Sequence, residues 1–224
     1  MISVLDVMNI VGAVAFAVAG ALVAVRHRMD IFGVNTLAII TATGGGLIRD
    51  LLMGVVPPVM FREPRYVLIS VITANILFLW MYLHKGETPQ RLTVIYEKAL
   101  LLSDTLGLAA FTVGGVLAGW RQNTENSLFF IVYLGVLTGV GGGLLRDVCA
   151  NTIPSIFIKR VYAVASIAGG LATGLLLKHS AFGSTVAAVA GSLIIIMIRL
   201  LAAHYRWSLP RLPEASQQTK EERP

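Results

Sequence analysis

The sequence predicts an all-α polytopic membrane protein with seven transmembrane helices, arranged as two inverted three-helix repeats followed by a seventh helix. Composition is the first observation that predicts it. Of 224 residues, 56% are hydrophobic and 13% are charged, and the mean hydropathy is +0.77, whereas a soluble domain of this size carries about 25% charged residues. The second is a repeated motif, because TATGGGLIRD at residues 41–50 returns as TGVGGGLLRD at residues 138–147.

Apolar runs predict the individual spans. A helix of about 20 residues crosses roughly 30 Å of hydrocarbon, and runs of that kind lie at residues 4–25, 33–53, 66–84, 99–119, 127–147, 161–178 and 182–202. The first run has no basic segment before it and carries Asp6, so we expect it to be retained rather than cleaved as a signal peptide. The polar stretch from residue 207 onward predicts a disordered tail outside the membrane.

The repeat extends beyond the motif and predicts the domain organisation. Matched residues lie 95 apart in the first spans of the two copies and 97 apart in the motif; among them Gly12, Phe16 and Gly20 match Gly107, Phe111 and Gly115. Each copy contains three spans, an odd number, so the second copy enters the membrane upside down. We therefore expect a first three-helix repeat at 1–92, a second, inverted repeat at 93–180, the seventh helix at 181–206 and a cytoplasmic tail at 207–224.

Lysine and arginine predict the orientation, because they concentrate in cytoplasmic loops. With the N-terminus outside, four basic residues of the loops face outward: Arg62, Arg65, Arg121 and Lys178. Twelve then face inward: Arg26, Arg28, Lys85, Arg91, Lys98, Lys159, Arg160, Arg199, Arg206, Arg211, Lys220 and Arg223. This bias predicts an external N-terminus and a cytoplasmic C-terminus. The net charge of +6 is accordingly interpreted as a topology signal, and no nucleic-acid partner is expected.

The glycine triplets are candidates for the functional site. Three adjacent glycines weaken a helix by roughly 1 kcal/mol each relative to alanine. We expect kinks in the second and fifth spans that turn backbone groups toward an aqueous path, and close helix packing is the alternative. The candidate pore residues are Gly44, Gly45, Gly46, Gly141, Gly142 and Gly143.

Charged and hydroxyl side chains accompany both triplets. Successive residues of a helix point to different sides, so we expect Arg49 to pair with Asp147 and Arg146 with Asp50, either as a clasp between the halves or as the lining of an ion pathway. Asn75 is expected to bridge two helices. Further polar candidates for the pathway are Thr41, Thr43, Thr138, Ser103 and Asp104.

Catalytic and metal-binding patterns are absent from the sequence. It contains no HExxH or GxSxG motif. Its single cysteine, Cys149, excludes an internal disulfide and a cysteine-based zinc site, and its four histidines have no metal-ligand spacing. The sequence therefore predicts no enzyme, no cofactor and no metal.

The paired Gly-Gly-Gly-Leu-(Ile/Leu)-Arg-Asp elements, in spans 2 and 5 of a three-plus-three-plus-one layout, resemble those of the TRIC family, the trimeric intracellular cation channels and their prokaryotic relatives. The resemblance covers residues 4–202. It implies a homotrimer in lipid, each protomer with its own pore lined by the kinked second and fifth helices, which passes potassium, sodium and other monovalent cations. The small size favours a prokaryotic inner-membrane protein.

Two other readings remain open. The same bacterial sequences are also grouped under a glycine-transporter-like domain (UPF0126-type). A carrier for a small zwitterion such as glycine would use an arginine for the carboxylate and an aspartate for the ammonium group. A scaffold that transports nothing is the second alternative, in which the polar core only fixes assembly.

Overall fold

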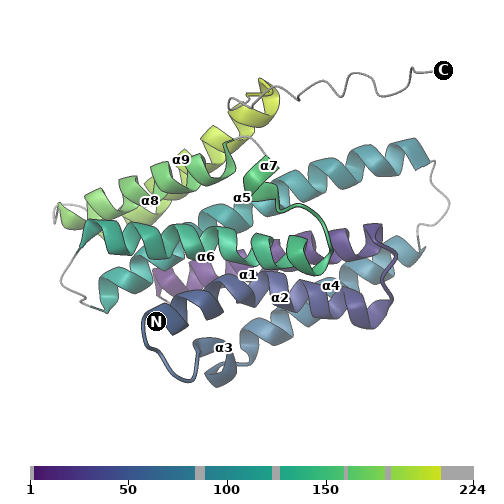
Figure 1. The fold of residues 1–224 in the computed structure, drawn as a ribbon, viewed down its shortest axis with the longest axis horizontal. Coiled ribbons are helices and arrows are strands. Elements are labelled where there is room, and N and C mark those ends of the chain that lie inside the picture. The colour runs from purple at the N-terminus through teal and green to yellow at the C-terminus, as the bar shows by residue number, and fades with distance from the viewer. Residues whose placement is uncertain (1–2, 84–88, 123–126, 159–160, 180–182, 208–224) are drawn as a thin grey trace, which may run out of the picture.

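The computed structural model describes residues 3–83, 89–122, 127–158, 161–179 and 183–207. In these ranges the chain forms nine α-helices and no strand (Figure 1). Six helices are long and apolar enough to cross a membrane, and α8 is a shorter apolar helix. The helices are α1 (Val4–Arg26), α2 (Ile31–Leu52), α3 (Val59–Arg62), α4 (Arg65–Leu83), α5 (Pro89–Arg121), α6 (Leu128–Cys149), α7 (Ser155–Ile158), α8 (Tyr162–Lys178) and α9 (Ser184–His204). The predicted all-helical polytopic class is confirmed.

Local sequence explains where these helices begin. Ser3 caps α1 and forms a capping box with Asp6, Asp30 caps α2, and Ser127 caps α6, each through a side-chain oxygen that accepts a backbone N–H of the first turn. Helix α5 begins ten residues before the predicted span at 99–119, at Pro89, a residue favoured in the first helical turn. The apolar-run criterion missed this first part because it carries polar residues.

The loops after α2 and α6 have the same backbone geometry. Gly54 and Asn151 both have positive φ, at 69° and 53°. In each loop the next residue donates its N–H to the carbonyl of the motif aspartate, Val55 to Asp50 and Thr152 to Asp147, both at 2.9 Å. Each loop then leads into a four-residue helix, α3 or α7, which sequence analysis did not predict.

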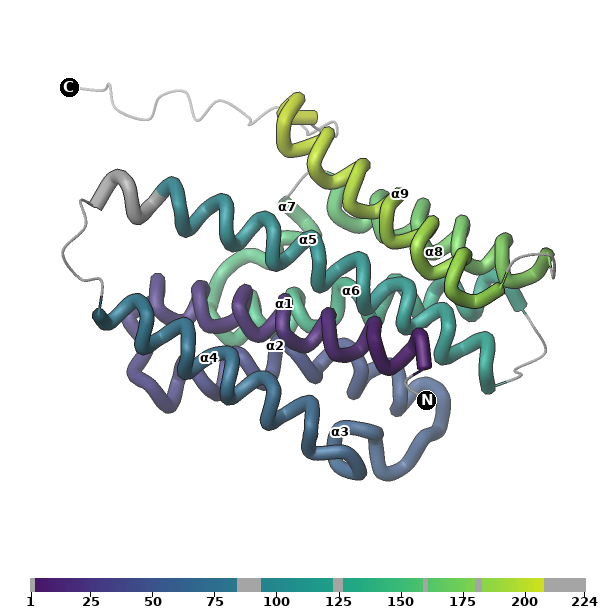
Figure 2. Tube along the Cα trace, turned by 180° about the vertical axis from the view of Figure 1, so that it is seen from behind, coloured from purple at the N-terminus to yellow at the C-terminus, as the bar shows by residue number. Residues whose placement is uncertain are grey.

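The core forms where α1, α2, α5 and α6 pack together. Helices α4 and α8 lie against these four, and α9 packs on α5 and α8 (Figure 2). Phe16 of α1 contacts Gly107 of α5, and Phe111 of α5 contacts Gly12 of α1. The two rings meet with their centroids 5.3 Å apart. Because the residue numbers rise along α1 as they fall along α5, the two helices are antiparallel and the contact is reciprocal.

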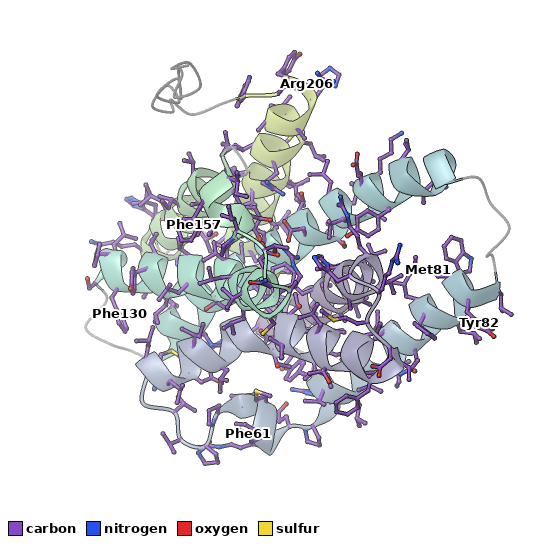
Figure 3. The ribbon with its side chains drawn as sticks, turned by 45° about the vertical axis from the view of Figure 1, so that its right-hand side comes forward. Phe61, Met81, Tyr82, Phe130, Phe157 and Arg206 are labelled. Atoms are coloured by element: carbon purple, nitrogen blue, oxygen red, sulfur yellow. The ribbon has the colours of Figure 1, made fainter. Side chains whose placement is uncertain are left out.

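The outer surface of the bundle is apolar. Figure 3 shows labelled side chains around its edge, and among them Phe61, Tyr82 and Phe157 are exposed. Helix α4 is the least buried of the candidate spans. A continuous apolar surface of this kind suits lipid and not water.

Candidate functional site

The two glycine triplets lie where α2 and α6 cross. A Cβ atom on Gly45 would overlap the carbonyl oxygen of Thr138, and one on Gly142 would overlap that of Thr41. The helices are therefore antiparallel, and their backbones touch at the crossing. The hydroxyl groups of Thr41 and Thr138 donate to carbonyls of their own helices, those of Leu37 and Leu134, both at 2.6 Å.

The remaining motif glycines border this crossing. A Cβ on Gly44 would meet the side chain of Leu145, and one on Gly141 would lie 3.1 Å from the Cα of Gly45. Each triplet lies inside one uninterrupted α-helix. Close packing, the alternative interpretation of the triplets, is thus observed, and the kink stays a prediction.

The predicted pairing between the two motifs is wrong, because each arginine binds the aspartate that follows it. Arg49 donates from Nε and Nη2 to Oδ1 of Asp50 at 2.9 and 2.8 Å, and Arg146 donates from Nε to Oδ1 of Asp147 at 2.8 Å. The long arginine side chain folds back far enough to reach its neighbour at the helix end. The antiparallel crossing also places the last turns of α2 and α6 at opposite ends of the bundle, so the cross pairs are out of reach.

The second carboxylate oxygen of each aspartate fixes the loop that follows. Oδ2 of Asp50 accepts the backbone N–H of Val59 at 2.9 Å, and Oδ2 of Asp147 accepts that of Ser155 at 2.7 Å. Both aspartates and both arginines of the motif are buried. Each pair is therefore neutral overall and tied to the start of α3 or α7.

A third aspartate makes the second pair part of a larger cluster. Asp104 of α5 is fully buried and accepts hydrogen bonds from Arg146 Nη1 at 3.0 Å, Arg199 Nη2 at 3.3 Å and the hydroxyl of Tyr162 at 3.4 Å. Sequence reasoning proposed Asp104 as a pathway residue but missed Arg199. The available signal was an arginine inside the seventh apolar run, since charges within spans mark specific partners.

Three cavities are lined by the motif pairs, two at Arg49 and Asp50 and one at Arg146 and Asp147. The first vestibule, of about 330 Å³, is lined by residues that include Leu5, Asp6, Asn9, Arg49, Asp50, Val55, Arg65, Arg121 and Gln122. A smaller cavity of about 40 Å³ is also lined by Asn9, Arg49 and Asp50, together with residues that include Thr43, Gly46 and Phe111. The second vestibule, of about 320 Å³, is lined by Val23, Arg26, His27, Tyr96, Leu100, Arg146, Asp147, Thr152, Ile153 and Ser155.

The two vestibules are built from matched residues and lie at opposite ends of the crossing. Arg49 and Asp50 in the first correspond to Arg146 and Asp147 in the second, and Arg121 corresponds to Arg26. Of the predicted pathway residues, Thr43 borders the smaller cavity, while Thr41 and Thr138 lie between the vestibules. The hydroxyl of Ser103 donates to the carbonyl of Leu100 in its own helix. Among the described residues, no group of three or more His, Cys, Asp or Glu side chains could hold a metal.

Comparison with known proteins gives the family. The sequence model described as "Glycine transporter" matches residues 6–82 and 101–178. A UPF0126 membrane protein of Deinococcus radiodurans is 37% identical over 211 residues, which are 92% of each chain. A solved structure of a TRIC cation channel is 31% identical with a TM-score of 0.78, and covers 93% of this chain and 97% of its own. The chain belongs to the TRIC family.

A second TRIC structure extends this comparison. The trimeric intracellular cation channel orthologue from Rhodobacter sphaeroides has a TM-score of 0.81 and 29% identity, over 91% of this chain and 99% of its own. Both TRIC structures are of channels, in agreement with the prediction that the chain is not an enzyme. Membership in the TRIC family also agrees with the resemblance of the paired glycine motifs.

Proposed function

We propose that this protein is a monovalent-cation channel, selective for potassium and sodium over anions, with a pore inside each protomer between α2 and α6. The observation that carries the proposal is the pair of matched vestibules, which end on Arg49–Asp50 and Arg146–Asp147 from opposite ends of one helix crossing. The similarity to TRIC cation channels supports it.

The glycine crossing separates the vestibules in this conformation. The backbones of α2 and α6 touch at Gly45 and Gly142, so no space for an ion joins the two cavities there. Conduction therefore requires the two helices to move apart at the triplets. Such a movement, which a kink at the glycines would provide, exposes backbone carbonyls and the hydroxyls of Thr41 and Thr138, the oxygen ligands that cation filters use.

Arginines beside the path do not prevent cation passage in this arrangement. Each motif arginine is neutralised by the aspartate to which it donates, at 2.8–2.9 Å. A neutral pair at each end of the path leaves the carbonyl and hydroxyl oxygens at the crossing to determine which ions bind.

We also propose the inverted seven-span topology. The antiparallel α1–α5 and α2–α6 contacts, which are reciprocal at Phe16, Phe111, Gly45 and Gly142, support repeats at 1–92 and 93–180 with a seventh helix at 181–206. At 1.5 Å per residue, the 17 residues of α8 reach about 26 Å, close to the thickness of the hydrocarbon core. The predicted tail at 207–224 lies outside the described residues, apart from Trp207.

The proposed setting is a bacterial inner membrane, with the N-terminus outside and the C-terminus in the cytoplasm. The distribution of basic residues between the loops supports this orientation. A homotrimer in lipid is proposed from the similarity to the trimeric channel of Rhodobacter sphaeroides.

The experiment that tests the channel is the reversal potential of the purified protein in a planar bilayer under a potassium chloride gradient. Single-channel steps that reverse near the potassium equilibrium potential are expected. Asp50→Asn and Asp147→Asn each remove one negative charge from a buried group that is neutral in the wild type, so each is expected to move the reversal potential toward that of chloride. A bilayer without current steps contradicts the proposal.

A carrier for glycine is the second candidate. The description of the matching family and the arginine beside an aspartate in each vestibule favour it. In this structure the arginine and aspartate bind each other, so a zwitterion would have to displace one from the other. Accumulation of labelled glycine in proteoliposomes, with no current in bilayers, would establish the carrier.

A further inference from the structure

The two halves differ beside their last motif glycines. A Cβ on Gly46 would enter nearly open space. Its one neighbour within 4 Å, apart from the backbone of its own helix, would be Nη2 of Arg49 at 3.8 Å. Gly46 lines the cavity of about 40 Å³. A Cβ on the matched Gly143 would meet the hydroxyl of Tyr162 at 3.3 Å and Oδ1 of Asp104 at 3.8 Å. The place that is open in the first half is filled in the second.

The carboxylate that helps to fill this place is bound by α9, a helix that has no counterpart in the first repeat. Asp104 corresponds to Asn9, a neutral residue that lines both cavities of the first half. Arg199 comes from α9, lies against Asp104 and is 4% exposed. Its guanidinium carbon is 4.6 Å from the centroid of the Tyr162 ring, and its Nε has no hydrogen-bond partner among the described residues.

Charge balance explains why Arg199 is needed. Among the described residues, the buried charges of the first half are Arg49 and Asp50, which sum to zero. Without Arg199, the second half would hold Arg146 against Asp104 and Asp147, a net charge of −1. A buried charge without a partner is strongly unfavourable, and in a membrane protein it attracts a counter-ion from any water that reaches it.

We propose that Asp104 is a monovalent-cation site whose resident cation is the guanidinium of Arg199. Oδ1 of Asp104 is held by Arg146 and Tyr162, and Oδ2 faces Arg199 alone among the described residues, so Oδ2 is the carboxylate oxygen that a permeant cation would take. Aspartate and glutamate side chains select cations in the pores of cation channels. Asp104 is connected to the second vestibule through Arg146, which forms an ion pair with Asp104 and also lines that cavity. Arg199 thus limits how negative the inner half of the path becomes, and it sets the cation selectivity there. This inference rests on the proposed channel function.

The test uses the full-length protein and three variants: Arg199→Gln, Asp104→Asn and the double variant. Removal of the guanidinium alone frees a carboxylate for permeant cations. One unit charge over roughly 10 Å, at an effective dielectric constant of about 20, favours potassium and disfavours chloride by about tenfold each. The permeability ratio of potassium to chloride is therefore expected to rise on the order of a hundredfold. Asp104→Asn is expected to lower the ratio, and the double variant is expected to return it toward that of the wild type.

Thermal unfolding of the same proteins in detergent tests the Asp104–Arg199 pair without any measurement of current. A failure of the pair can therefore be distinguished from a failure of the channel proposal. Each single variant is expected to unfold at a lower temperature than the double variant, because each leaves one buried charge uncompensated. If the wild type carries no current, the channel proposal fails while the unfolding cycle still reports on the pair. If the cycle shows coupling and the wild type conducts, but Arg199→Gln does not raise the ratio, the pair is structural and the proposed site is overturned.

Two matched controls complete the design. Asn9→Asp places the counterpart of Asp104 in the first half, where α9 supplies no arginine. It is expected to raise cation selectivity, as Arg199→Gln does, because each variant makes the charge beside the path more negative by one unit. His204→Gln changes an exposed residue at the end of α9 and is expected to leave both the permeability ratio and the unfolding temperature unchanged.

Discussion

At the scale of single residues, glycine is required where the backbones of α2 and α6 touch. Gly45→Ala and Gly142→Ala each place a methyl group on a carbonyl oxygen of the facing helix. We expect each to destabilise the protein by about 1–3 kcal/mol, the usual cost of overpacking. Gly46→Ala is the matched control, since its methyl group enters open space and its helix propensity improves by about 1 kcal/mol. Unfolding in detergent measures all three, and equal losses would contradict the crossing.

The motif ion pairs carry a second prediction at this scale. Arg49→Gln leaves the buried Asp50 with the Val59 N–H but no positive charge, at a cost of about 3–5 kcal/mol. Arg49→Gln combined with Asp50→Asn removes both charges and is expected to recover most of that loss. Chemical unfolding of the two variants gives the comparison. A double variant that is no more stable than the single one would show that the pair is not a coupled unit.

Sequence reasoning found the four charged residues of the motifs but mispaired them. The rule that adjacent residues point to different sides describes Cβ directions, and it neglects the reach of an arginine such as Arg49 at a helix end. The location of Arg199 inside an apolar run indicated that it has a specific partner. That this partner is Asp104 could not be predicted, because α9 has no copy in the first repeat against which a contact could be matched.

At the scale of elements, α2 and α4 are joined by one polar contact within their apolar sequences. Nδ2 of Asn75 donates to Oδ1 of Asn35 at 2.8 Å and to the carbonyl of Val71 in its own helix. The predicted helix-bridging role of Asn75 is confirmed. Asn75→Leu is expected to cost only about 0.6 kcal/mol, the average for hydrogen bonds between transmembrane helices. Unfolding in a fixed detergent tests this, and a loss of several kcal/mol would contradict it.

The long helices were predictable because apolar runs report directly on helices that lie in lipid. All seven apolar runs correspond to helices in the structure. Helices α3 and α7 were not predicted, since four residues give no hydrophobic period, and they are held by hydrogen bonds from their backbone to Asp50 and Asp147. The start of α5 was missed because polar helix turns extend past an apolar run.

At the scale of the whole molecule, the two vestibules are expected to open on opposite sides of the membrane. In a Cys149→Ser background, Val55→Cys reports on the first vestibule and Thr152→Cys on the second. With the N-terminus outside, we expect a membrane-impermeant thiol reagent to label residue 55 from outside and residue 152 from inside. Labelling of both positions from the same side would contradict the inverted topology.

The reciprocal contact between α1 and α5 has a consequence for how such a chain can arise and assemble. The first half carries the knob Phe16 and the socket Gly12, which receives Phe111. The second half carries the knob Phe111 and the socket Gly107, which receives Phe16. A single half is therefore self-complementary toward a copy of itself inserted the other way round. The covalent link between the halves then ensures that they are made in equal numbers, and it is not needed for one half to recognise the other. We therefore expect the halves to assemble in one bilayer when residues 1–92 and 93–224 are synthesised as separate polypeptides.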